Sequence, residues 1–207
     1  MPEQGGGGTD RHPRRRDAAP GLIAALLLCL AGGFALTSTP DETWIEGGIE
    51  LRLDGLDADF GPDVARFPVG FSATGVETTS GVEALGWAGL AGSVAIAATR
   101  GRSRRIAGAA LLAVGLAATF VVGRVAVDPF NAYRAHVGLP AADDPVGTHR
   151  TQWVWIALAG ALALLAAGVL TTRYGPRWPA LGGRYDRTEQ PDDAWAALDR
   201  GEDPTEA

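Results

Sequence analysis

The sequence predicts an all-α membrane protein: a bundle of four transmembrane helices, a small β-containing outer loop and a mostly disordered cytoplasmic tail. Four apolar stretches of about 18 to 22 residues would each span roughly 27 to 33 Å as helices, which matches the hydrocarbon core of a bilayer. The chain contains arginine but no lysine, and the segments that flank these stretches are alternately rich and poor in arginine. The predicted spans are 21–38, 82–99, 106–127 and 153–172.

The arginines also orient the spans. Arginine-rich segments are the N-terminus (1–20), the link between the second and third spans (100–105) and the C-terminal tail (173–207). The segments 39–81 and 128–152 hold few arginines, and the first of them is acidic. Because the positive-inside rule places arginine-rich flanks in the cytoplasm, both termini are predicted to be cytoplasmic. The abundance of Ala, Gly and Arg is typical of a GC-rich bacterial genome, so the expected location is a bacterial plasma membrane.

The N-terminal segment is rich in Gly, Arg and Pro without periodicity, which predicts disorder. The span that follows has two interpretations. Arg14–Arg16 and Leu22–Leu30 could be the first two regions of a cleaved signal peptide. We favour an uncleaved span, because the apolar run continues to Leu36 and no small-x-small cleavage site precedes Thr37.

Two runs of alternating apolar and polar residues lie in the acidic outer loop, at 49–54 and 69–73. They predict a small β-hairpin or sheet on the outer surface, with an irregular polar loop as the alternative. Aspartates between the runs could bind calcium in principle, but their spacing is not that of an EF-hand. We expect a solvated acidic face at these residues, which are Asp54, Asp57, Asp59 and Asp63.

The second outer loop begins with Asp128-Pro129, where Asp can cap a helix and Pro can open it. Phe130, Tyr133 and Val137 follow at i, i+3 and i+7, which predicts a short interfacial helix with aromatic rings at headgroup depth. The imidazoles and carboxylates of this loop match no established zinc-ligand spacing, so neither a metal nor another cofactor is predicted. These residues are His136, Asp143, Asp144 and His149.

Small residues recur at four-residue spacing in the later spans, which lets helix backbones approach closely. This spacing predicts a compact bundle but does not identify which faces touch. The residues are Gly89 and Ser93; Gly115, Thr119 and Gly123; and Ala159, Ala163 and Ala167.

Arg124 is the one ionisable residue predicted to be buried in the membrane region, and such residues are candidate functional sites. It lies near the outer end of its span, within snorkelling reach of water. Asp128 follows four residues later on the same helix face. We favour an anchor or a local ion pair over a polar site between helices, because an ion relay would need several carboxylates or histidines at mid-depth.

The first part of the tail combines basic and aromatic residues. Arg177 and Arg184 can meet anionic headgroups, while Trp178 and Tyr185 can lie at the membrane interface. These four residues are therefore predicted to form an interface with lipid or with a partner.

The end of the tail is predicted to contain a short helix near 193–200. An aspartate can cap its start and a glycine can end it, and Trp195 and Leu198 share one face. A helix of two turns is not stable alone, so this face should dock on the bundle, the membrane or a partner. Because the segment is acidic, we favour a protein partner over anionic lipid.

The tail also carries a recognisable pair of motifs. RWPALGGRY (177–185) follows the last span, and DAWAALDRGEDPT (193–205) follows a polar linker. After four Ala/Leu/Gly-rich spans, this pair resembles the tryptophan-operon-associated conserved membrane protein family (tryptophan-associated transmembrane protein) of high-GC Gram-positive bacteria. The chain has Leu181 where the family usually has Met. The resemblance implies a genomic link to tryptophan biosynthesis and no particular activity, cofactor or catalytic residue.

Two classes of function remain. We favour a non-enzymatic accessory or scaffold factor linked to tryptophan biosynthesis; the alternative is a subunit of a transporter or exporter for an aromatic metabolite. The absence of mid-membrane charge and of broken helices argues against a self-sufficient transporter, and no nucleophile–base pair or metal constellation supports an enzyme. The net charge of −6 gives no argument for nucleic-acid binding. Expected partners are the lipid bilayer, a protein bound by the tail and, in a homo-oligomer, a second copy of the chain.

Overall fold

The computed structural model describes residues 19–52, 66–137 and 145–178. The predictions for the N-terminal segment, for the four aspartates of the first outer loop and for Asp143 and Asp144 lie outside these residues. The tail predictions for Arg184, Tyr185, Trp195 and Leu198 also lie outside them.

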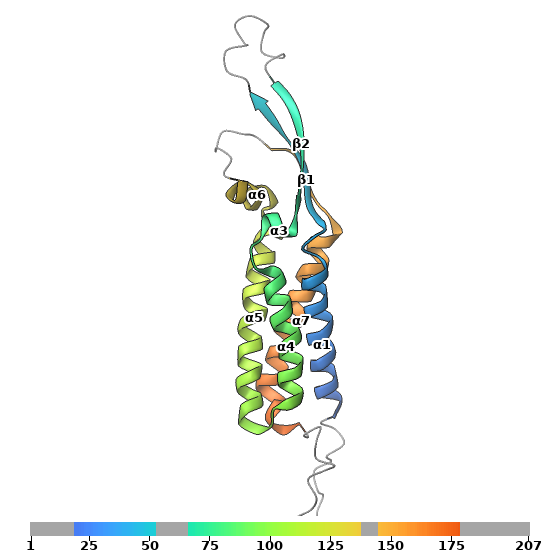
Figure 1. The fold of residues 1–207 in the computed structure, drawn as a ribbon, viewed down its shortest axis with the longest axis vertical. Helices are drawn as coiled ribbons and strands as arrows, with labels where there is room; N and C mark the ends of the chain where they lie inside the picture. Colours follow the sequence, from blue (N-terminus) through green and yellow to red (C-terminus); the bar gives the residue numbers. More distant parts are fainter. Residues whose placement is uncertain (1–18, 53–65, 138–144, 179–207) are drawn as a thin grey trace, which may run out of the picture.

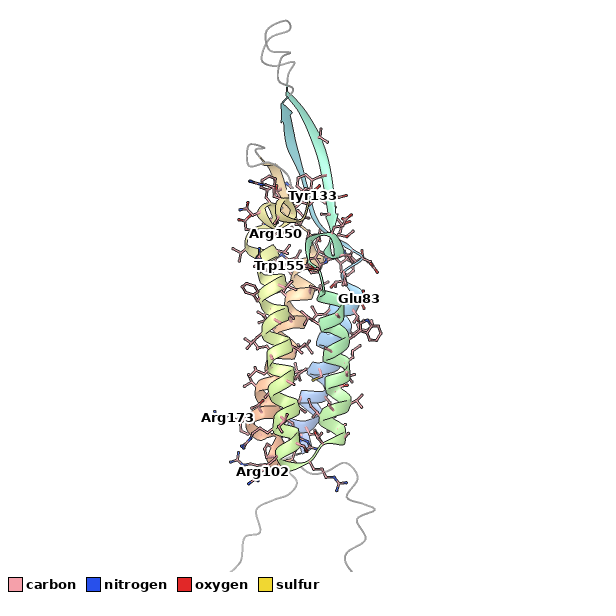
Figure 2. All side chains as sticks on the ribbon, turned by 60° about the vertical axis from the view of Figure 1, so that its left-hand side comes forward. Glu83, Arg102, Tyr133, Arg150, Trp155 and Arg173 are labelled. Atoms are coloured by element: carbon pink, nitrogen blue, oxygen red, sulfur yellow. The ribbon has the colours of Figure 1, made fainter. Side chains whose placement is uncertain are left out.

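In the described part of the chain, four long helices run side by side as a bundle, and a slender sheet rises from one end (Figure 1). We call this end the sheet end and the opposite one the arginine end, where Arg102 and Arg173 lie (Figure 2). Each helix packs against two others, in the cyclic order α1, α4, α5, α7. The bundle helices are α1 (Ala19–Ser38), α4 (Val82–Ala98), α5 (Gly101–Val127) and α7 (Gln152–Tyr174).

Three helices of the described chain, α1, α5 and α7, are long and apolar enough to cross a membrane, with mean hydropathies of 2.1, 2.2 and 2.2. The fourth, α4, is apolar but has 17 residues. At about 1.5 Å per residue it measures roughly 25 Å, which is at the short end of the range for a span. Three of the four predicted spans therefore correspond to helices that are long and apolar enough to cross a membrane, and a span at α4 stays a prediction.

The connection between the second and third long helices is shorter than the predicted arginine-rich link 100–105. The turn between α4 and α5 consists of Thr99 and Arg100, and the next arginines belong to the first turns of α5. Gly101 has a φ of 55°, a left-handed conformation that glycine adopts without steric cost. The chain therefore reverses within two residues, and α5 begins five residues earlier than its apolar stretch.

Glycines bring α7 into backbone contact with two neighbours. A Cβ added to Gly115 of α5 would lie 2.5 Å from the backbone nitrogen of Leu165. A Cβ on Gly32 of α1 would lie 2.6 Å from the carbonyl oxygen of Gly160. Such distances exclude any side chain, so these helices pack as closely as small residues permit.

The predicted small-residue repeats mark the contact faces only in part. Gly89 and Ser93 are buried, but Ala159 is exposed, and a Cβ on Gly123 would meet nothing within 4 Å. The buried face of α7 runs instead through Ala157, Ala161, Leu164 and Gly168. An Ala/Gly-rich helix offers several faces with this spacing, and only the neighbouring helices select one.

The sheet has the strand order β2-β1-β3 within the described residues. β1 (Thr43–Arg52) pairs antiparallel with β2 (Arg66–Thr74), and the predicted alternating runs face each other, with Ile49 opposite Val69. β3 (Pro145–Arg150) pairs antiparallel with the other edge of β1. The third strand was not predicted, because it belongs to the second outer loop and forms only through pairing with the first.

Trp44 joins the sheet to the bundle. Its side chain is fully buried, and its Nε1 donates a hydrogen bond of 2.8 Å to the carbonyl oxygen of Thr39, just after α1. The backbone nitrogen of Thr151, just before α7, donates to the carbonyl oxygen of Trp44 at 2.9 Å. A Cβ on Gly75 would lie 2.6 Å from the indole ring. The sheet therefore begins directly at the ends of two bundle helices.

Candidate functional site

The helix α6 (Pro129–Val137) lies across the sheet end of α5, and its residues line the candidate site that is described below (Figure 1). Asp128 caps this helix, as the Asp-Pro pair predicted. Its carboxylate accepts hydrogen bonds from the backbone nitrogen and the side-chain amide of Asn131, at 3.1 and 2.6 Å. These two bonds, helped by the charge of Arg150, hold the pKa of Asp128 below its ordinary value of 3.8. The carboxylate is therefore ionised at neutral pH.

Aromatic contacts fix α6 against the rest of the protein. Tyr133 stacks on Phe71 of β2, with ring centroids 4.4 Å apart and planes 11° apart. The side chain of Phe130, the second residue of α6, is buried, and the guanidinium of Arg134 lies over its ring. Arg150 of β3 donates a hydrogen bond of 2.9 Å to the last carbonyl of α5, on Val127. Figure 2 shows Tyr133 and Arg150 at this end of the molecule. Residues of both predicted outer loops, 39–81 and 128–152, therefore hold α6 in place.

Two cavities in the described structure meet at Arg124. The first, here called the α3 cavity, has a volume of about 250 Å³. It lies between α5, α6 and the short helix α3 (Gly75–Thr78). Besides Arg124 and Ala132, its lining consists of Thr78, Thr79, Ser80, Val121, Val125 and Ala135.

The second cavity, here called the α5 groove, has a volume of about 530 Å³ and follows one face of α5 up to α6. Arg124 and Ala132 line it as well, so both cavities share these two residues. The rest of its lining consists of Thr119, Phe120, Gly123, Val127, Asp128 and Asn131.

Arg124 is exposed at the junction of the two cavities. Its Cζ atom lies 5.9 Å from the centroid of the Phe120 ring, a cation–π distance. The predicted ion pair between Arg124 and Asp128, both described residues, is not formed: Arg124 makes this ring contact, and the carboxylate of Asp128 accepts its hydrogen bonds from Asn131. The arrangement offers one guanidinium and one carboxylate beside an apolar surface.

The fully buried arginine of the described structure is Arg104, at the arginine end. It is 0% exposed, and its Nε donates a hydrogen bond of 3.1 Å to the carbonyl oxygen of Ile96 in α4. Its Nη1 donates to the carbonyl oxygens of Gly175 and Trp178, at 3.3 and 3.2 Å. The Ile96 carbonyl lies in the last turn of α4, and the other two carbonyls lie in and just after the 3₁₀ helix η2 (Gly175–Arg177), which directly follows α7. Helix C-terminal ends carry partial negative charge, which favours a cation here. Arg104 therefore connects three helices.

The sequence-based interpretation did not single out Arg104, because it counted this residue among the arginines of the link 100–105; the membrane depth of Arg124 stays a prediction. A signal was available in the spacing along α5. Arg104 is in register with Gly108, Leu111 and Gly115, at i, i+4, i+7 and i+11, which is the buried face of the helix. The run of neighbouring arginines concealed this register.

Trp178, which is predicted to lie at the membrane interface, packs inside the protein, and its depth in a membrane stays a prediction. It follows the short 3₁₀ helix η2 (Gly175–Arg177) and is only 9% exposed. A Cβ on Gly21 of α1 would lie 3.0 Å from its Nε1, so the indole packs against that helix. Arg177 is exposed, and the structure does not bring it together with Arg124: Arg177 ends η2 after α7, whereas Arg124 is in the last turn of α5, beside α3 and α6. Within the described residues, no group of three or more His, Cys, Asp or Glu side chains could hold a metal.

Comparison with known proteins identifies one relationship. Searches of curated proteins and of solved structures return no match. A family model described as tryptophan-associated transmembrane protein matches residues 25–205, which include most of α1 and all of α4, α5 and α7. That description specifies no activity. The match covers most of the chain and confirms the resemblance carried by the tail motifs, so the chain belongs to the tryptophan-associated transmembrane protein family.

Proposed function

We propose that this protein is a non-enzymatic accessory or scaffold factor of the bacterial plasma membrane, linked to tryptophan biosynthesis, which presents a sheet on a bundle of four spans. The observation that carries the proposal is the junction at Trp44, where the sheet is built directly onto two helix ends. A surface held in one orientation on a membrane bundle suits the positioning of a partner. The close glycine packing of the bundle also supports a structural role over a conducting one.

The side chains at the two ends support the membrane placement. Trp155 is exposed toward the sheet end, and Arg102 and Arg173 are exposed at the arginine end (Figure 2). Trp87 is also exposed, and its Nε1 donates a hydrogen bond of 3.2 Å to Glu83, which lies toward the sheet end (Figure 2). From Trp155 to Arg173, about 18 helical residues measure roughly 27 Å, close to the thickness of a hydrocarbon core. Tryptophan prefers the membrane interface, and arginine prefers the cytoplasmic side. The sheet would therefore lie outside and both termini inside.

The same argument supports α4 as the fourth span. This helix packs between α1 and α5, and it exposes Trp87 and Val94. A short apolar helix held between two spanning helices at the same depth would itself be surrounded by lipid. Its 17 residues can cross a bilayer that thins slightly around the protein.

Cysteine labelling in intact cells tests the orientation. In a Cys29→Ala background, Asp57→Cys should react with a membrane-impermeant maleimide. Thr188→Cys in the tail should react only after the cells are permeabilised. The reverse pattern, or protection of both positions in intact cells, would refute the proposed topology.

The acidic end of the tail is the proposed site for a protein partner. We infer that Trp195 and Leu198 bind this partner, because an apolar pair in an acidic segment favours a protein surface over anionic lipid. Burying both side chains could contribute on the order of 3–5 kcal/mol before ordering costs, enough for transient binding. Replacing both by alanine should abolish crosslinks to the tail without changing abundance in the membrane, whereas Thr205→Ala should retain the crosslinks. Loss of the protein from the membrane would instead assign the pair to the protein's own fold.

A second candidate function, a subunit of a transporter for an aromatic metabolite, is favoured by the two cavities at Arg124. A deletion strain separates the two functions. Loss of an accessory factor should alter tryptophan-pathway intermediates inside the cell without a matching change outside. A changed ratio of external to internal metabolite would favour the transporter subunit.

A further inference from the structure

The α5 groove presents an apolar surface to its surroundings. Phe120 and Val127, which line it, are 67% and 80% exposed. Leu116, one helical turn from Phe120 toward the middle of the bundle, is also exposed. Exposed apolar side chains in a row along a spanning helix are the surface that an acyl chain covers.

At the end of this row, the groove is lined by one cation and one anion. Arg124 and Asp128 are four residues apart on one helix face, because the Asp128 backbone nitrogen still donates the helical hydrogen bond to the Arg124 carbonyl oxygen, at 3.0 Å. Each carboxylate oxygen of Asp128 accepts one hydrogen bond from Asn131 and retains capacity for a second. The groove can therefore bind an anionic and a cationic group at the same time.

Other charged groups nearby are engaged elsewhere. Arg150 is bonded to the carbonyl oxygen of Val127, and Arg134 lies over the ring of Phe130. Neither arginine is among the residues that line the groove. The charged side chains that line the groove are thus Arg124 and Asp128, and Arg150 adds positive charge near Asp128 from outside it.

The depth of Arg124 matches that of a lipid phosphate, an argument that depends on the proposed membrane placement. Arg105 is exposed at the arginine end, and about 19 helical residues separate it from Arg124. This separation is roughly 28 Å, so the two guanidiniums would lie at opposite faces of the hydrocarbon core.

From this combination we propose that the α5 groove binds phosphatidylethanolamine, with the lipid phosphate on Arg124, its ammonium on Asp128 and one acyl chain along Phe120 and Leu116. A guanidinium can bind phosphate through two parallel hydrogen bonds, and a primary ammonium donates to a carboxylate. Phosphatidylglycerol would offer the phosphate alone and leave Asp128 facing an uncharged group. Phosphatidylcholine has a cationic group that cannot donate a hydrogen bond.

Native mass spectrometry of the full-length protein in detergent tests the proposal, with the three lipids carrying identical acyl chains. Phosphatidylethanolamine should bind at the lowest lipid concentration. Arg124→Gln and Asp128→Asn should each weaken its binding about three- to tenfold, the loss of one charge-assisted contact. Asparagine caps helices as well as aspartate does, so the second variant keeps α6. Arg134→Gln, which changes an arginine outside the groove, is the matched control and should leave binding unchanged.

The proposal would be overturned by phosphatidylglycerol binding as tightly as phosphatidylethanolamine, or by unchanged phosphatidylethanolamine binding in both groove variants. Displacement of the lipid by free phenylalanine, another zwitterion with an apolar part, would assign the groove to a soluble ligand and would also overturn it. Membrane fractionation of the wild-type protein is measured in parallel. If the protein is found in the membrane fraction but shows no preference for phosphatidylethanolamine, only the lipid site is refuted. If the protein is absent from the membrane fraction, the proposed function is refuted.

Discussion

Replacing Arg104 with lysine is expected to destabilise the protein by about 3 kcal/mol. The guanidinium is fully buried and donates three hydrogen bonds to carbonyl oxygens of Ile96, Gly175 and Trp178. A lysine ammonium lacks the planar fork that reaches two helix ends at once, so about two of these bonds are lost. Each lost bond to a charged donor costs about 1.5 kcal/mol or more, because the carbonyl stays buried. For a chain of this size, about 3 kcal/mol corresponds to a fall in Tm of roughly 6 to 12 °C.

Thermal unfolding of the full chain in detergent, followed by tryptophan fluorescence, measures this change. Trp178 accepts one of the three bonds through its backbone carbonyl and packs nearby, so it reports on the same region. Arg105→Lys is the control, because Arg105 is the adjacent arginine and is exposed. Its replacement should change Tm by less than about 2 °C. Equal shifts for the two variants would refute the argument that Arg104 connects the helix ends.

Three further variants test the packing, the sheet junction and the helix cap. Gly115→Ala should destabilise the protein by about 1–3 kcal/mol, because the new methyl group overlaps the backbone of α7. Gly123→Ala is the control, because Gly123 has open space around it, and this variant should be neutral or slightly stabilising in thermal unfolding. Trp44→Phe should cost about 1 kcal/mol through the lost Nε1 hydrogen bond, and the exposed Trp87→Phe should cost less in the same assay. Asp128 has a lowered pKa in the folded state, so its contribution to stability is present above its unfolded value and is lost as pH falls through the folded value. The difference in Tm between wild type and Asp128→Asn should therefore shrink once the pH falls below about 3.8; a constant difference would contradict the lowered pKa of Asp128.

The bundle helices and the hairpin could be predicted because their signals are local. The four long helices begin and end within two residues of the predicted apolar stretches, except at the start of α5. The alternation at 49–54 and 69–73 indicated the two strands that pair with Ile49 opposite Val69. The Asp128-Pro129 pair indicated the cap and start of α6. In each case, the property that decides the structure lies in neighbouring residues.

The sequence by itself determined that the chain is a membrane protein and the family to which its tail motifs belong, whereas the orientation inferred from its arginines stays a prediction. Only the tertiary structure decided that Arg104 is buried and Arg124 is exposed. That outcome depends on the C-terminal ends of α4 and α7 meeting beside the first turn of α5, and no local pattern records where three helix ends converge. The third strand and the cavities at Arg124 have the same origin, because each forms between segments that are distant in the sequence.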